Sequence, residues 1–128
     1  MSYEADIRNA MLADEGLTNL IGTKVFWDVA EGDTPPPYVV LQTVSNSGET
    51  AFDGSRDDEF PLIQFVAWAA TKLQSIAIRS AIRTAIEGRD LSGTSNTSLG
   101  YSNDLSGYDP QTKLFSALIE YRASSTTT

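Results

Sequence analysis

The 128-residue chain contains neither cysteine nor histidine. Their absence excludes thiolate nucleophiles, Ser-His-Asp triads and imidazole acid–base catalysis. It also removes the nitrogen and sulfur ligands on which most zinc sites are built. A chain without cysteine is compatible with a reducing compartment but does not require one. We expect no cofactor and no enzyme of these classes.

Positive charge is also scarce, because nine Lys and Arg face seventeen Asp and Glu and leave a net charge of −8. This balance repels a nucleic-acid backbone unless basic groups cluster on one face, so tight DNA or RNA binding is disfavoured. Long apolar runs are missing, and the first residues carry Glu4 and Asp6 where a secretory signal has lysine or arginine. We expect a soluble chain without membrane contact.

What the chain does have is the composition of a folded domain, with 41% hydrophobic and 9% aromatic residues. Its length suits one domain that buries a core without disulfides or metal. We expect a single domain over residues 1–123, followed by a polar tail at residues 124–128 that is frayed unless a partner orders it.

The central stretch is an apolar strand that leads directly into a helix. Residues 60–68, FPLIQFVAW, have apolar side chains on both faces, which indicates a strand covered on both sides or facing another subunit. Thr71 is an N-cap for a helix over residues 72–87, and Gly88 is its C-cap.

Four charged residues of this helix fall on one narrow stripe: Lys72, Arg79, Arg83 and Glu87. The two arginines could form a phosphate site. Because no aromatic residues interleave with them and the chain is acidic, a solvated helix face is the favoured interpretation.

The N-terminal third begins with an amphipathic helix at residues 2–14, whose apolar positions recur at intervals of three and four. A short apolar connector follows at residues 17–21 and ends at Gly22. Residues 24–29, KVFWDV, have the composition of a short strand. We expect one helix and one strand here.

A proline-rich segment separates this strand from the next. Pro35, Pro36 and Pro37 lack amide donors, so the segment is a stiff loop that sets the entry angle of a strand at residues 38–44. The alternative, a ligand for an aromatic groove, is less favoured.

Residues 45–59, SNSGETAFDGSRDDE, separate two strong strands and predict a long β-hairpin with a mobile tip. Exposed loops between rigid strands often carry contacts, so the candidate contact residues of the protein are Glu49, Phe52, Asp53, Arg56, Asp57 and Asp58. The acidic spacing does not match a calcium-binding loop. Nothing in the sequence suggests a raised pKa for the adjacent Asp57 and Asp58.

The C-terminal part combines a weak edge strand near residues 99–105 with a closing strand at residues 113–123. The element order predicts an α+β fold, in which a mainly antiparallel sheet of four to five strands carries two helices on one face. Two helices cannot cover every apolar strand face. We expect an oligomer to bury the remainder, unless the second face is more mixed in polarity.

The order and spacing of four segments carry a family resemblance: GTKVFW at residues 22–27, PYVV at 37–40, QFVAWA at 64–69, and DPQTKLFSALIEYRA at 109–123, which includes the closing strand. Together with the N-terminal helix, they resemble the tail-completion family of long-tailed bacteriophages, also described as head-to-tail joining or tail terminator proteins. Residues 93–107 depart from the pattern, and no motif is a chemical signature.

The resemblance implies a structural virion protein, not an enzyme, that forms a six-fold ring at the head–tail junction. Such a ring would end the tail tube, dock the head–tail connector or stopper protein, and let DNA pass without specific binding. Its partners would be other copies of the chain, the tail tube protein and the connector, and it would assemble in the host cytoplasm.

Two alternatives come from other classes. A small acidic, non-catalytic adaptor could use the loop to mask a basic partner, and neighbouring portal, tail and tape-measure genes would argue against it. A carboxylate-only enzyme needs paired acids in a cleft, and the scattered acids here nominate no such pair.

Overall fold

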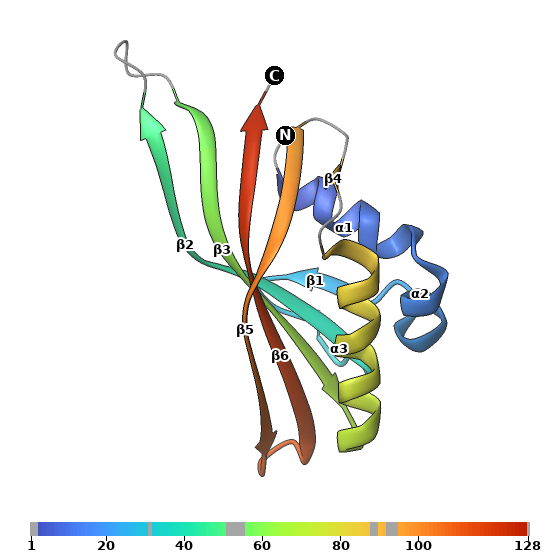
Figure 1. Ribbon diagram of the computed structural model, residues 1–128. Helices are drawn as coiled ribbons and strands as arrows, with labels where there is room; N and C mark the ends of the chain where they lie inside the picture. The colour runs from blue at the N-terminus through green and yellow to red at the C-terminus, as the bar shows by residue number, and fades with distance from the viewer. Residues whose placement is uncertain (1–2, 31, 51–55, 88–89, 92–94, 128) are drawn as a thin grey trace.

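The computed structural model describes residues 3–30, 32–50, 56–87, 90–91 and 95–127, which form one curved sheet with helices on one face (Figure 1). The described strands form a six-stranded sheet in the order β1-β2-β3-β6-β5-β4. This confirms the α+β class, the mainly antiparallel sheet and the helices on one face. None of the helices in these described ranges is long and apolar enough to cross a membrane.

The N-terminal segment forms a pair of helices, α1 (Tyr3–Ala13) and α2 (Glu15–Ile21). The expected connector is therefore helical, which adds a helix to the two predicted. Asp14 is the reason, because its side chain accepts a hydrogen bond from the Leu17 amide at 2.9 Å and starts a new helix. Gly22, at φ 65°, ends that helix.

Strand β1 (Val25–Trp27) runs parallel to the start of β2 (Tyr38–Thr50) at one edge of the sheet. Two hydrogen bonds link helix α1 to β1. The Trp27 indole donates to the Glu4 carbonyl at 3.1 Å, and the Arg8 guanidinium donates to the Val25 carbonyl at 3.0 Å.

The strands of the β2–β3 hairpin are longer than expected, because β3 spans Arg56–Ala69 and pairs with β2 as far as Thr50. Most of the segment predicted as loop, residues 45–59, is therefore strand. Polar side chains there have low strand propensity, but the two strands pair with each other and β3 also pairs with β6 at Asp58 and Glu59, which satisfies backbone groups. Residues 51–55 lie outside the described part of the chain.

The C-terminal strands also exceed the prediction. β5 (Ser95–Asp109) and β6 (Leu114–Thr127) form a long antiparallel hairpin, and β4 (Asp90–Leu91) adds a short edge beside β5. The polar segment 124–127, expected to be a tail, continues β6 and pairs with β5.

Each outer long strand contains a β-bulge. The β2–β3 register skips Val44, and the β5–β6 register skips Ser102. An extra residue in an outer strand bends the sheet locally, and the long strands curve near their middle (Figure 1).

Helix α3 (Lys72–Ile86) lies across β3 and β6, with Thr71 as the predicted N-cap. Glu87 is the observed C-cap, and Gly88 lies outside the described residues. The core between helices and sheet includes Ile7, Phe65, Ile82 and Tyr121, each fully buried. The helices of the described residues therefore lie on one side of the sheet, where α2 packs against α1 and α3.

Candidate assembly surface

The face of the sheet opposite the helices, here called the open face, carries apolar side chains that no helix covers. Alternation along β3 makes this plain. Ile63, Phe65 and Ala67 point into the core and are fully buried, whereas Val66 and Trp68 point the other way and are partly exposed. An apolar face left uncovered by its own chain is a candidate contact surface.

One cross-strand row gives the open face an apolar band. Val40 on β2 pairs with Val66 on β3, Val66 pairs with Leu118 on β6, and Leu118 pairs with Leu105 on β5. Leu105, at the far end of the row, is 56% exposed. The band therefore runs from one side of the sheet to the other and ends in an exposed leucine.

A cavity of about 450 Å³ lies at the β2 end of this band. The β1–β2 connection and the open face line it together, through Asp28, Val29, Ala30, Gly32, Tyr38, Val40, Gln42, Val66 and Trp68. We call this cavity the hollow. Val29 on its rim is 73% exposed, so the hollow presents apolar surface to solvent.

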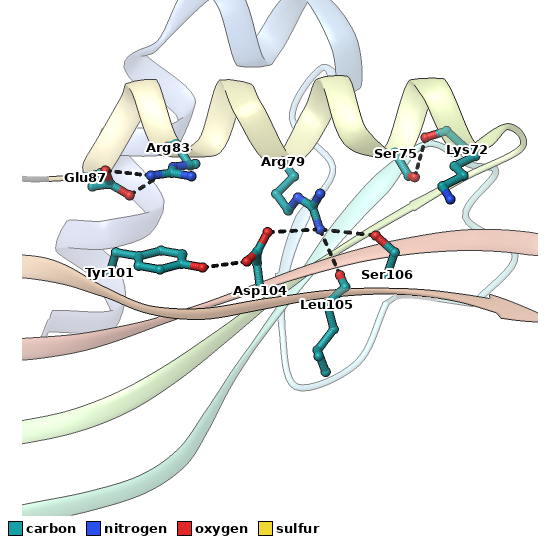
Figure 2. A network of polar contacts seen from close by, with 9 residues as sticks. All are labelled: Lys72, Ser75, Arg79, Arg83, Glu87, Tyr101, Asp104, Leu105 and Ser106. Carbon is teal, nitrogen blue, oxygen red and sulfur yellow. Dashed lines mark hydrogen bonds and ion pairs between the residues drawn. The ribbon is translucent and has the colours of Figure 1, made fainter.

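A polar network that begins at Arg79 joins helix α3 to β5 (Figure 2). The Arg79 guanidinium donates to the Leu105 carbonyl at 2.9 Å and lies 3.7 Å from the Asp104 carboxylate. Asp104 also accepts a hydrogen bond from the Tyr101 hydroxyl. The Arg79 side chain is 16% exposed, so the expectation of a solvated arginine stripe is wrong at this position.

The second arginine of the stripe, Arg83, forms a bidentate ion pair with Glu87, with both hydrogen bonds at 3.1 Å, and lies over the Tyr101 ring. Tyr121, fully buried on β6, donates to Glu87 at 2.9 Å. The hydrogen bond from Arg83 lowers the pKa of Glu87, with a further contribution from Tyr121. Burial raises the pKa of Tyr121, and the hydrogen bond to Glu87 raises it further.

These polar contacts fasten α3 to the sheet. Their carboxylates accept from guanidinium and phenol groups that serve as fixed partners. Among the residues that the structure describes, no group of three or more Asp, Glu, His or Cys is placed to hold a metal ion.

The structure describes the predicted contact residues only in part. In the strand register, Glu49 lies opposite Asp58 and Thr50 lies opposite Arg56, near the end of the hairpin. Phe52 and Asp53 lie outside the described residues, and Asp57 lies in β3. The structure brings the described members to one end of the sheet, while the hollow and the apolar band lie elsewhere.

Sequence reasoning missed the hollow and the end of the apolar band. The hollow depends on a connection that returns to the open face, which the proline-rich composition does not reveal. Leu105 lies in a segment with loop composition, where weak alternation from Leu99 to Leu105 was the available signal.

The family model described as "Tail completion protein gp17" matches residues 5–125. The chain belongs to this family. Membership identifies it as a structural protein of the bacteriophage tail and hence of the virion. No curated protein matches the sequence.

A solved structure described as "Virion of native gene transfer agent (GTA) particle" contains a similar chain. The two chains are 21% identical, with a TM-score of 0.73, and the match covers 98% of this chain and 95% of the other. At this identity the likeness establishes the shared fold over nearly the whole chain.

Proposed function

We propose that the protein forms a ring at the head–tail junction of a long-tailed phage particle. The ring, expected to be six-fold, ends polymerisation of the tail tube and presents a docking surface to the head–tail connector. The observation that carries this proposal is the match to the tail-completion family over residues 5–125, because it spans all the elements of the fold.

The open face supports an assembly role. A band of apolar residues crosses the sheet without cover from the chain's own helices, and a hollow lies at one end of it. Apolar surface of this kind becomes buried when subunits associate.

The ring's lumen lets DNA through without holding it. A net charge of −8 suits this task, because a negative wall repels the phosphate backbone and does not trap it. We infer that the lumen is acidic. A ring structure with a clearly basic bore would contradict this inference.

The β2–β3 hairpin is the proposed contact with a neighbouring subunit or ring. Its described strands extend to Thr50 and Arg56 at one end of the sheet, and Glu49, Phe52, Asp53, Arg56, Asp57 and Asp58 are the candidate contacts. The proposed partners are other copies of the chain, the tail tube protein and the connector. Assembly takes place in the host cytoplasm.

Disrupting the gene and examining the lysate by electron microscopy tests the proposal. We expect filled heads beside unattached tails, including tails of irregular length, and restoration of particles by a plasmid copy. Intact particles in normal numbers would remove the protein from the junction and favour the adaptor role.

A further inference from the structure

Two unassigned features lie at opposite sides of the sheet. The hollow adjoins β1 and β2 at one side, while the exposed Leu105 lies on β5 at the other. Both belong to the open face: Figure 2 shows the Leu105 side chain pointing away from α3, and Leu105 pairs with Leu118 of the apolar band. A recess and a projecting leucine on opposite sides of one molecule suit head-to-tail association.

The two features also lie at the same height along the strands. Val40 lines the hollow, and its cross-strand row leads through Val66 and Leu118 to Leu105. In a ring whose axis runs along the strands, rotation alone would bring the β5 side of one copy to the β2 side of the next at similar height. Leu105 would therefore reach its neighbour near the hollow.

Exposed groups of opposite charge lie at the two sides. Asp28 and Asp33 are exposed in the β1–β2 connection beside the hollow. On the β5 side, exposed Lys113 lies in the β5–β6 turn, and exposed Lys72 lies against the end of β5, where it lines a second, smaller cavity with Tyr108. Opposite charges at the two sides favour contact between unlike edges over contact between like edges.

Asp104 and Asp109, the acids of β5, are already engaged within the chain. Asp104 accepts from Tyr101 and pairs with Arg79, while Asp109 accepts from the Gln111 amide and the Thr112 hydroxyl. Arg79 therefore compensates part of the charge of Asp104, while neutral donors satisfy the acceptor atoms of Asp109. The lysines of this side are the groups available to an acidic neighbour.

The contact uses the Leu105 side chain, because the backbone at this point is occupied. Arg79 donates to the Leu105 carbonyl at 2.9 Å and to the Ser106 hydroxyl at 3.3 Å. Continuation of the sheet by a neighbouring strand would compete with these bonds. A leucine placed in an apolar recess requires no such exchange.

We propose that Leu105 of one copy packs into the hollow of the next copy, beside Val29 and Trp68, and that this contact repeats around the ring. The inference rests on the proposed ring and assigns its subunit interface. It also explains why the apolar band extends from β2 to β5.

Cross-linking tests the contact cleanly, because the natural chain has no cysteine. Single variants Val29→Cys and Leu105→Cys are mixed in equal amounts at high concentration and treated with a short bismaleimide. We expect a cross-linked dimer containing one chain of each variant, and little product from either variant alone. The double variant should give a ladder of increasing oligomers.

A mixture of Val29→Cys with Asn19→Cys, which is exposed on α2, is the matched control. Cross-linking of the 29 and 105 positions no faster than this control would overturn the contact. Electron microscopy of the natural protein tests independently whether rings form. Rings without the 29–105 bond would remove this interface and leave the ring proposal standing.

A second pair of variants tests the apolar character of the contact. Leu105→Asp should weaken self-association about tenfold or more, because a buried interface anchor becomes charged. Leu105→Met should retain it. Leu73→Asp, at an 81% exposed leucine on α3, controls for added negative charge. Equal association by Leu105→Asp and the natural protein would contradict the proposal.

Discussion

At the scale of single residues, Glu87 and Tyr121 determine how α3 is fixed to the sheet. Glu87 at the helix C-terminus receives hydrogen bonds from Arg83 in its own turn and from the buried Tyr121 on β6. Two donors on one carboxylate couple the helix end to the core. The predictions at this scale concern stability.

Tyr121→Phe should lower the free energy of unfolding by about 1 kcal/mol, the typical net contribution of one hydrogen bond. The ring stays in its buried site against Phe65, so packing is preserved. Urea denaturation gives the value. Tyr101→Phe is the comparison, because its hydroxyl contact with Asp104 is exposed and should matter less. Equal losses in both variants would contradict this account.

Glu87 also predicts a pH dependence. Its pKa is lowered from 4.5 in the folded chain by the hydrogen bonds from Arg83 and Tyr121. The carboxylate therefore contributes stability above its unfolded pKa, and this contribution is lost as pH falls below about 4.5. The stability gap between the natural protein and Glu87→Gln should narrow on acidification. Parallel stability curves in the two proteins would refute the role.

At the scale of elements, the β2–β3 hairpin carries a prediction about assembly. Replacing residues 51–55 with Asn-Gly should leave the fold intact, because that turn suits a two-residue hairpin connection between Thr50 and Arg56. The thermal midpoint should stay near that of the natural protein, while the yield of complete particles in a complementation assay should fall. Normal particle yield would show that the tip makes no essential contact.

The strands and helices also show which parts of the fold the sequence predicts. The core strand at residues 60–68 and the helix after Thr71 were predictable, because hydrophobic periodicity and an N-cap residue act locally. β5 was predicted only as a short, weak strand, because its Ser, Asn and Gly residues have loop composition. Its regular structure comes from pairing with β6, which periodicity within the segment does not encode.

Helix α2 and the contacts of Arg79 are two smaller features that local sequence patterns did not predict. Asp14 ends one helix and begins the next, whereas the sequence predicted one helix followed by an apolar connector. Arg79 fits a solvated stripe on its own helix, yet β5 lies close enough to bind it. The family resemblance was recoverable from segment order, but the hollow was not, because it requires the three-dimensional course of the β1–β2 connection.

At the scale of the whole molecule, the acidic balance bears on DNA passage. A protein with net charge −8 should show no binding to duplex DNA at physiological ionic strength, and none should emerge on lowering the salt. Fluorescence anisotropy with labelled DNA measures this. Salt-dependent binding would indicate a basic surface facing the DNA and would contradict the acidic lumen.

The most direct test of the central claim is a cryo-electron microscopy reconstruction of the head–tail junction in the particle that encodes this chain. The account predicts a closed ring of copies between the last tube ring and the connector, with Leu105 of each copy against the hollow of its neighbour. Density for the chain at another place in the particle, or absence of the chain from the particle, would contradict the account.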